Sequence, residues 1–441
     1  MEFKEIEKIL SANVEGQISE LENFVHPADI LEAIIDRDDL HELLMKFPKT
    51  LIVQIMEEAE EETQLRILEH FSDDEKSEIL NEMSRDEVVD LVGELEEEQQ
   101  EEVIELLDED AREEVEKLLT YDSDSAGGIM TTEFIAVYED MTMDDVISYI
   151  RKNTDAETIY YLYVVDREQY LKGVVTLRDI VCQPSETLVK SIVRPNVISI
   201  HYNMDQEEVS RMFEKYGFML MPVVDDHNHM IGVITVDDIL DVMEEEMTED
   251  IHRLAGINKE EKVDGSIANS VKSRLPWLIV NLITAVLAST VIDLFSETIS
   301  KIVALSAVMT IISGMGGNAG TQTLTIVIRG LSLGEIDKEN AKRILGKEIG
   351  VGLIAGTVIG IFVAGIAMYY EFNPIFGLVA GIAMILNMLC AAVAGYAIPI
   401  ILNKIHIDPA LASGVFVTTV TDVLGFLFFL GLATLVMPYL L

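Results

Sequence analysis

The chain has 441 residues, which is more than one hydrophobic core usually holds, and it carries a formal net charge of −47 and two cysteines. Two cysteines are too few for a disulfide-stapled scaffold, and the acidity excludes binding to nucleic acid, which is itself a polyanion. Residues 271–441 contain nine basic and nine acidic side chains, so the entire net charge belongs to residues 1–270. The two parts of the chain therefore differ in physical character.

Residues 1–122 are predicted to form an acidic, all-α N-terminal domain. Apolar residues recur at helical spacing in short stretches that polar breaks separate. Ser72 and Glu75 fit the capping-box pattern of a helix N-terminus, and Ser84 and Glu87 repeat it. This spacing favours stacked helical hairpins, whose acidic outer faces are most simply explained as solvated surface.

Residues 123–185 and 186–246 are predicted to be two copies of one α/β unit. The run Tyr163–Ile180 matches the run Pro222–Ile239, with 59 residues between equivalent positions. Each run reads as strand, turn, strand and acidic helix start. This double pattern resembles a tandem CBS pair, a module that binds adenine nucleotides, metal ions or no detectable ligand.

The acidic part offers little that could carry a reaction. It has no nucleophile elbow, no glycine-rich phosphate loop and no metalloprotease helix, so an enzyme is disfavoured. The segment 225–229 contains two aspartates and two histidines, which could bind a transition metal. Its place between two strand-like runs is more typical of an ordinary turn.

Residues 247–270 are predicted to form a connecting helix, and residues 271–441 a five-helix transmembrane domain. Each apolar stretch has about the 20 residues that an α-helix needs to cross the hydrocarbon of a bilayer. The predicted spans are Trp277–Ser296, Lys301–Ile328, Ile349–Tyr369, Pro374–Leu402 and Leu411–Val436.

Basic residues flank these spans unevenly. Lys272 and Arg274 precede the first span, five basic residues lie between the second and third, and Lys404 precedes the fifth, whereas the opposite loops carry only Lys301. By the positive-inside rule, the acidic part lies in the cytoplasm and the C-terminus faces outward. No cleavable signal is expected, because the chain begins with a charged amphipathic stretch.

A glycine-rich segment interrupts the second predicted span. Ser313–Gln322 contains four glycines and Asn318, which weaken a helix where lipid tolerates no unsatisfied backbone. Such a segment must pack against protein or line a water-filled path. Gly316 and Gly320 also have the small-xxx-small spacing of close helix packing, so both interpretations stay open.

One carboxylate, Asp422, lies near the middle of the last span. Burying it there costs about 2.5–3.5 kcal/mol on insertion scales, so it should face protein or water. A single carboxylate with amide and backbone oxygens suits hydrated Mg²⁺, which gives up its waters reluctantly. In a symmetric dimer, Asp422 and Asn318 facing one path would form a cation pore with one anionic ring. Proton coupling and a structural hydrogen bond are the alternatives for Asp422. Glu348, with Lys347 as a neighbour, is interpreted as structural.

With these elements in this order, the chain resembles the MgtE family of magnesium transporters and channels, and the resemblance covers essentially the whole chain. The segments that carry it are Arg274–Leu278, Gly316–Gln322, Asn387 with Gly395 and Pro399, Asp408–Ala410, Thr418–Thr419 and Asp422–Gly425. Val415 follows Gly414 where the family usually has proline, and Gly217 occupies a CBS position that can be acidic.

The resemblance implies a homodimer in the plasma or inner membrane of a prokaryote, with a central Mg²⁺ pore that closes when the acidic domains bind cytosolic Mg²⁺. It makes Asp422 the pore carboxylate, with Gly316, Gly317, Asn318 and Thr419 beside the path. The regulatory ligands that it implies are Asp86, Asp90, Asp238, Asp241, Glu246, Glu249, Asp250, Glu207 and Glu214. ATP at the CBS pair is an optional second ligand. A transporter for Mn²⁺ or Co²⁺ and a membrane-anchored nucleotide sensor are the rival functions.

Overall fold

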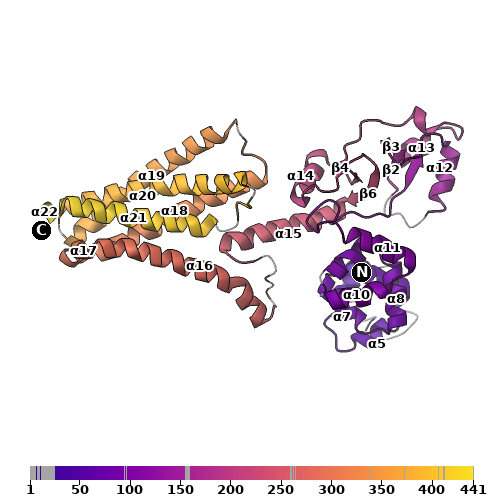
Figure 1. Ribbon diagram of the computed structural model, residues 1–441, viewed down its shortest axis with the longest axis horizontal. Coiled ribbons are helices and arrows are strands. Elements are labelled where there is room, and N and C mark those ends of the chain that lie inside the picture. The colour runs from indigo at the N-terminus through magenta and orange to yellow at the C-terminus, as the bar shows by residue number, and fades with distance from the viewer. Residues whose placement is uncertain are drawn as a thin grey trace. The chain divides into compact units, whose positions relative to one another are not determined.

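The computed structural model describes residues 6, 10, 25–93, 95, 97–153, 159–258, 261, 263, 265–337, 339–371, 373–405, 407–410 and 413–440 (Figure 1). These residues belong to two compact units, Met1–Met243 and Glu244–Leu441.

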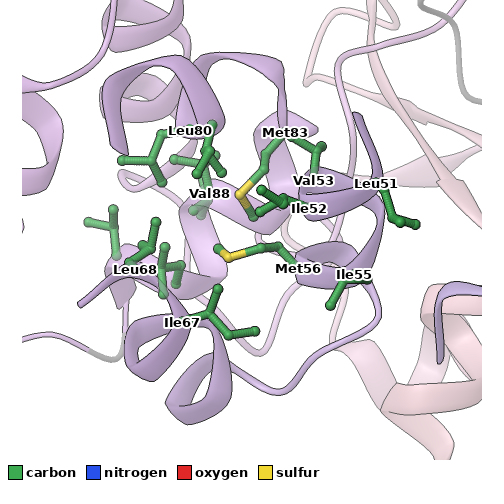
Figure 2. Close-up of a cluster of buried hydrophobic side chains, with 14 of the residues drawn as sticks. Leu51, Ile52, Val53, Ile55, Met56, Ile67, Leu68, Leu80, Met83 and Val88 are labelled. Carbon is green, nitrogen blue, oxygen red and sulfur yellow. The ribbon is translucent and has the colours of Figure 1, made fainter. Parts of the chain in front are cut away.

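Short helices that pack on alternate neighbours make up the N-terminal part of the first unit. Helix α4 contacts α6, α6 contacts α8, and α9 contacts both α7 and α11, as expected for stacked hairpins. Their inner faces share one core, part of which Figure 2 shows around Met56 and Leu80. The capping box of Ser72 and Glu75 is confirmed at the start of α8. The helices are α4 (Pro27–Ile34), α5 (Leu40–Leu44), α6 (Lys49–Glu57), α7 (Glu61–Leu68), α8 (Asp73–Glu82), α9 (Arg85–Gly93), α10 (Glu97–Glu105) and α11 (Glu109–Leu118).

The predicted internal repeat is confirmed by two three-stranded sheets with the same topology. In each sheet the first strand runs parallel to the second, and the second runs antiparallel to the third. The register shifts at the same place in both copies, between Val164 and Val165 and between Val223 and Val224. The first copy comprises β1 (Ala136–Tyr138), α12 (Met143–Ile150), β2 (Tyr161–Val165), β3 (Leu171–Thr176) and α13 (Leu177–Cys182). The 3₁₀ turn η1 (Val189–Ser191), β4 (Ile200–His201), α14 (Gln206–Tyr216), β5 (Leu220–Val224) and β6 (Met230–Thr235) follow.

Two equivalent turns join the copies. Gln169 and Asn228 both have a positive φ, 67° and 64°, at the tips of the β2–β3 and β5–β6 hairpins. The backbone of each hairpin donates one hydrogen bond to the tip of the other: Leu171 to Asn228 at 3.2 Å and Met230 to Gln169 at 3.0 Å. The two repeats therefore form a pair.

Helix α15 (Val236–Ala255) follows β6 directly and is the connecting helix. The predicted bounds of that helix, 247–270, are wrong. It begins inside the segment assigned to the second repeat and ends at Ala255, where Gly256 adopts φ 71°. A left-handed glycine ends a helix because it lets the chain turn away without strain. Residues 259, 260, 262 and 264 of the predicted helix lie outside the described residues.

Long helices fill the rest of the second unit: α16 (Ile267–Leu294), α18 (Ala304–Ser332), α19 (Ala341–Glu371), α20 (Pro374–Lys404) and α21 (Ser413–Leu435), with the short α17 (Ser296–Lys301) and α22 (Met437–Leu440). Each long helix corresponds to one predicted span, although Leu411 lies outside the described residues. Four are long and apolar enough to cross a membrane: α16, α19, α20 and residues Gly414–Leu435 of α21. Helix α18 is less apolar because of its glycines and polar residues, and it packs against α20 and α21. Helix α20 is the centre of the bundle, since 56% of its apolar window is buried against 6% for α16.

Candidate functional site

Helices α18 and α21 form an antiparallel seam that positions Asp422. A Cβ atom on Gly320 would lie 2.4 Å from Val417 Cγ1, so only glycine lets α21 approach here. One turn earlier on α18, Gly317 faces Thr418. Helix α18 runs unbroken through the glycine-rich segment. The structure therefore supports the close-packing interpretation of these glycines.

Asn387 of α20 lies at the centre of this seam, between α18 and α21. It is fully buried and donates from Nδ2 to the backbone oxygen of Ile312 at 2.8 Å. Gly316 of α18 and Gly425 of α21 both face it, since a Cβ on either would lie 2.2 Å or 2.8 Å from Nδ2. Gly316, predicted to lie beside the path, faces the Asn387 amide within one chain, and any side chain at this position would collide with that amide.

Asp422 is half-buried and accepts a hydrogen bond from the hydroxyl of Ser313 on α18. Thr419 uses its hydroxyl within α21, donating to the backbone oxygen of Val415 at 2.6 Å. Asn318 is exposed, and no hydrogen bond joins it to Asp422 among the described residues. The structure thus supplies Asp422 with a partner that the sequence did not indicate.

A second buried carboxylate, Glu348 of α19, lies apart from this seam. It accepts a hydrogen bond from Thr323 of α18 at 3.3 Å, and the ammonium group of Lys347 lies 3.1 Å from its other oxygen. Both partners come from the protein itself, and Lys347 is the predicted neighbour. These contacts agree with a structural role.

In the first unit, acidic side chains gather around Asp86 at the start of α9. Asp86 is buried, and its Oδ1 has no hydrogen-bond partner among the described residues. The capping box predicted for Ser84 and Glu87 is wrong. Ser84 donates its backbone N–H to Glu57 at 3.1 Å, and Glu87 accepts from Gln64 at 3.1 Å. Glu57 and Glu87 therefore belong to this acidic cluster, although the sequence pattern did not predict that they would.

Burial and mutual repulsion perturb the carboxyl groups of this acidic cluster. Burial first, and then the charges of Asp86 and Asp90, raise the pKa of Glu87 to about 9. Burial raises the pKa of Glu133 to about 7. Burial, followed by the charge of Asp86, raises the pKa of Asp238 to about 6. The protonated forms are favoured because ionised carboxylates repel one another away from water. The charge of Asp86 acts on Asp238, so these two carboxyl groups belong to one cluster.

No group of three or more His, Cys, Asp or Glu side chains is already arranged to hold a metal ion in the part of the chain that the structure describes. This does not conflict with a magnesium site, because Mg²⁺ keeps several waters and uses only one or two carboxylates directly.

The other predicted regulatory residues are more dispersed. Asp90, Asp241 and Glu214 are exposed, and Glu246 is half-buried on α15. Glu207 forms an ion pair with Arg211 at 2.8 Å.

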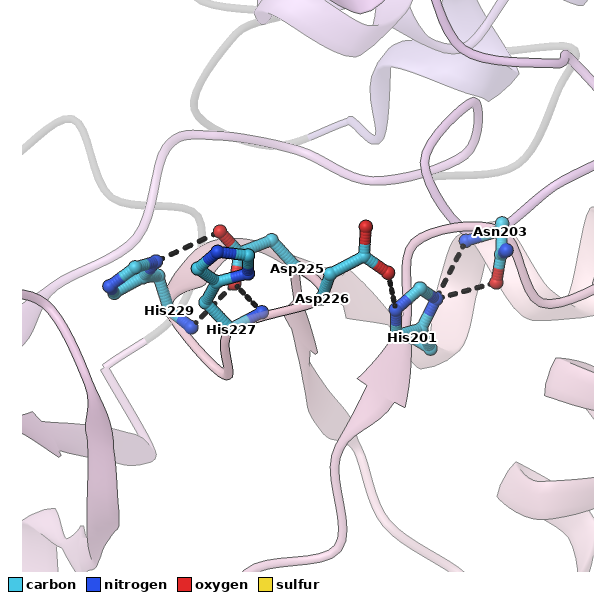
Figure 3. Close-up of polar contacts among 6 residues, drawn as sticks. All are labelled: His201, Asn203, Asp225, Asp226, His227 and His229. Carbon is cyan, nitrogen blue, oxygen red and sulfur yellow. Dashed lines mark hydrogen bonds and ion pairs between the residues drawn. The ribbon is translucent and has the colours of Figure 1, made fainter.

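The predicted turn at 225–229 is confirmed, and the side chains of its two aspartates contact different histidines (Figure 3). His229 contacts Asp225 through Nδ1 at 2.9 Å, whereas Asp226 contacts His201 at 3.0 Å. Asp225 also accepts the backbone N–H groups of His227 and His229, both at 2.8 Å. These hydrogen bonds and the charge of His229 lower the pKa of Asp225 to about 2 despite partial burial. The segment is a capped hairpin turn.

The end of α15 is attached to the chain that enters α21. Arg253 donates to Asp408 and also forms an ion pair with Glu249. Leu254 packs on a buried cluster that includes Ala410 and Val417. A second link joins Ser332, the last residue of α18, to Asp250 at 3.2 Å. Glu249 and Asp250, predicted as ion ligands, therefore have protein partners in this structure.

Comparisons with known proteins agree with the order of these parts. A family model described as a divalent cation transporter, MgtE, matches residues 309–432. The MgtE intracellular N domain matches 24–124, and the CBS domain matches 126–183 and 189–245. The magnesium transporter MgtE of Thermus thermophilus is 37% identical over 321 residues, which cover 72% of this chain and 71% of that one.

Two solved structures resemble the first unit. The cytosolic domain of a Mg²⁺ channel MgtE in complex with ATP is 35% identical, with a TM-score of 0.50, and the match covers 54% of this chain and 98% of that one. The soluble part of a magnesium transporter is 32% identical, with a TM-score of 0.52, over 55% of this chain and 97% of that one.

Proposed function

The chain belongs to the MgtE family of divalent cation transporters, and from that premise we propose that it carries Mg²⁺ across the membrane as a homodimeric channel. The observation that carries this proposal is Asp422, a half-buried carboxylate at the seam of two membrane helices. A fixed negative charge there favours cations over anions and neutral solutes. A transporter rather than an enzyme follows from the same premise.

Mg²⁺ is the proposed cargo because the seam offers oxygen atoms only. Carboxylate, hydroxyl and backbone oxygens suit hard cations such as Mg²⁺ and Mn²⁺, and the 37% identical relative named as a magnesium transporter favours Mg²⁺. Gly317, Asn318 and Thr419 would lie beside the path. A second copy of the chain would supply the other half of that path, since Asn318 is exposed and only 6% of the apolar window of α16 is buried within one chain.

The acidic cluster is the proposed sensor that closes the channel. Ionised Asp86 and Asp238 repel each other, and a divalent cation between such carboxylates would replace repulsion with attraction. Ions that bind only the compact form stabilise it by about RT ln(1 + [L]/Kd) per site, so the stabilisation grows once the ion concentration exceeds Kd. Asp90, Asp241, Glu207, Glu214 and Glu246 would add weaker sites.

The connecting helix α15 would couple ion binding in the acidic cluster to the membrane unit. Arg253 and Asp250 join α15 to the start of α21 and the end of α18, the two helices that hold Asp422 and Ser313. Glu249 and Asp250 could bind ions only after leaving Arg253 and Ser332.

We also propose ATP as a ligand of the CBS pair. The support is the 35% identical cytosolic domain that crystallised with ATP. The uneven distribution of basic loops supports a cytoplasmic N-terminal unit and a plasma-membrane location.

Flux through the purified full-length protein in liposomes tests this function. We expect Mg²⁺ to cross when its concentration on the side of the N-terminal unit is low, and the flux to fall as that concentration reaches the millimolar range. Mn²⁺ and Co²⁺ as competitors would identify the preferred cation, and ATP on the same side would show whether it shifts the closing concentration. Binding of ATP by a protein that passes no cation would favour a nucleotide sensor.

Mg²⁺ binding by the first unit should release protons at pH 7. Asp238, Glu133 and Glu87 have pKa values of about 6, 7 and 9 in the folded unit, above the value of about 4 in the unfolded chain. Their protonated forms therefore contribute fully to the stability of the folded unit below pH 4, and this contribution is lost as the pH rises through the folded pKa values. A cation prefers the ionised form, so it must displace protons, up to about one to two per chain. A pH indicator in weak buffer measures the release, and the apparent Mg²⁺ affinity should rise between pH 6 and pH 8. Titration with K⁺ is the control, and an affinity that does not depend on pH would contradict the assignment.

A further inference from the structure

Ser313 donates the only side-chain hydrogen bond that Asp422 receives among the described residues. The threonine hydroxyls near Asp422 on its own helix are used elsewhere. Thr418 donates to the backbone oxygens of Gly414 and Val415, each at 3.0 Å, and Thr421 donates to that of Thr418 at 2.9 Å. The direct partner of the carboxylate therefore comes from α18.

The packing of α18 against α21 brings Ser313 and Asp422 together. Gly317, one turn from Ser313 on the same face of α18, lies against Thr418, one turn from Asp422 on α21. Asn387, which lies between α18 and α21, donates to the backbone oxygen of Ile312, the residue next to Ser313. Ser313 thus reaches Asp422 because glycines and a buried amide set the spacing of the helices.

The hydroxyl of Ser313 and the water shell of a cation compete for the same acceptor. A hydrated Mg²⁺ ion presents water hydrogens to a carboxylate, and Ser313 presents a hydroxyl hydrogen. A carboxylate oxygen that accepts from Ser313 is less available to the ion. Conduction requires an ion site that is attractive enough to enter and weak enough to leave.

We propose that Ser313 is a positioning residue that orients Asp422 and limits how tightly it holds a hydrated divalent cation. This inference rests on the proposed role of Asp422 in conduction. A hydrogen bond to a charged group changes binding by about tenfold. Loss of the hydroxyl should therefore strengthen ion binding and slow ion release.

The test compares Ser313→Ala, Ser313→Thr and wild type as full-length proteins in liposomes, with flux measured over a range of Mg²⁺ concentrations. Ser313→Ala should lower the half-saturating concentration about tenfold and lower the maximal flux several-fold. Ser313→Thr keeps the hydroxyl and should restore both values. Thr310→Ala is the matched control, because Thr310 lies on α18 and donates only to the backbone of its own helix, at Ala307 (2.8 Å).

A fall in the half-saturating concentration together with a fall in maximal flux would not arise from a merely structural role, which lowers the amount of active protein and leaves half-saturation unchanged. Unchanged values in Ser313→Ala, or equal changes in Ser313→Ala and Ser313→Thr, would overturn the inference. If Ser313→Ala does not fold, Ser313→Cys retains the size with a weaker donor and should shift both values in the same directions by less. Wild-type flux in Asp422→Asn would instead overturn the proposed function, so the two failures are distinguishable.

Discussion

Replacing Asp422 by Asn should reduce Mg²⁺ flux by about 100-fold or more in liposomes that contain equal amounts of folded protein. The substitution keeps the size of the side chain and its contact with Ser313, but it removes the negative charge that offsets the cost of bringing a dication into the membrane. Flux of ²⁸Mg or a Mg²⁺-sensitive dye trapped inside the liposomes measures the loss.

Asp293→Asn is the matched control for this loss. Asp293 is also an aspartate of a membrane helix, but it is exposed near the end of α16, so its neutralisation should leave flux at the wild-type level. Asp422→Glu keeps the charge one methylene further from α21 and should retain part of the flux. Wild-type flux in Asp422→Asn would remove Asp422 from the conduction path.

Neutralising Asp86, Asp90, Asp238 and Asp241 together by Asn should leave a channel that conducts but does not close at millimolar Mg²⁺. These side chains include buried Asp86 and half-buried Asp238, whose repulsion a cation would relieve, so without their charge Mg²⁺ gains little by binding. In this variant, flux should no longer fall as the Mg²⁺ concentration on the side of the N-terminal unit is raised. Mg²⁺ should also no longer protect residues 1–270 from protease.

A second quadruple variant separates local charge from total charge. Glu98, Glu101, Glu102 and Glu105 are exposed on α10, and replacing all four by Gln removes the same amount of negative charge. This variant should still close in Mg²⁺. If both quadruple variants stay open, the acidity of the whole unit rather than the cluster around Asp86 controls closure. If both close normally, the sensor lies elsewhere.

Periodicity in the sequence was sufficient to identify the elements of this fold. The repeat at a spacing of 59 residues became two matching sheets, and each predicted membrane span became one long helix. These features depend on local hydrophobic patterns, which a single segment displays by itself. The connecting helix was misplaced because an acidic helical pattern continues from Val236 without a break at the predicted boundary, and Gly256 ends it early.

The candidate sites could be predicted only in part. Asp422 was identifiable because a charge within an apolar span is unusual. Its partner Ser313 lies 109 residues away, and no local pattern indicates which hydroxyl meets a carboxylate across two helices. Glu57 and Glu87 were missed for a related reason: a capping-box spacing accounted for Glu87 locally, whereas its actual partner, Gln64, is 23 residues away.

The order of the helices along the chain has a consequence for biosynthesis. Helix α18 is less apolar than the four helices that qualify as membrane spans by composition, and most of its packing is against α20 and α21. A ribosome delivers α18 first and completes α21 only after about 100 further residues, which takes roughly 5–20 s. Helix α20 arrives earlier and brings Asn387 to Gly316, but Gly317 and Gly320 meet their partners Thr418 and Val417 only when α21 is complete. The packing of α18 is therefore finished by the last long helix of the chain.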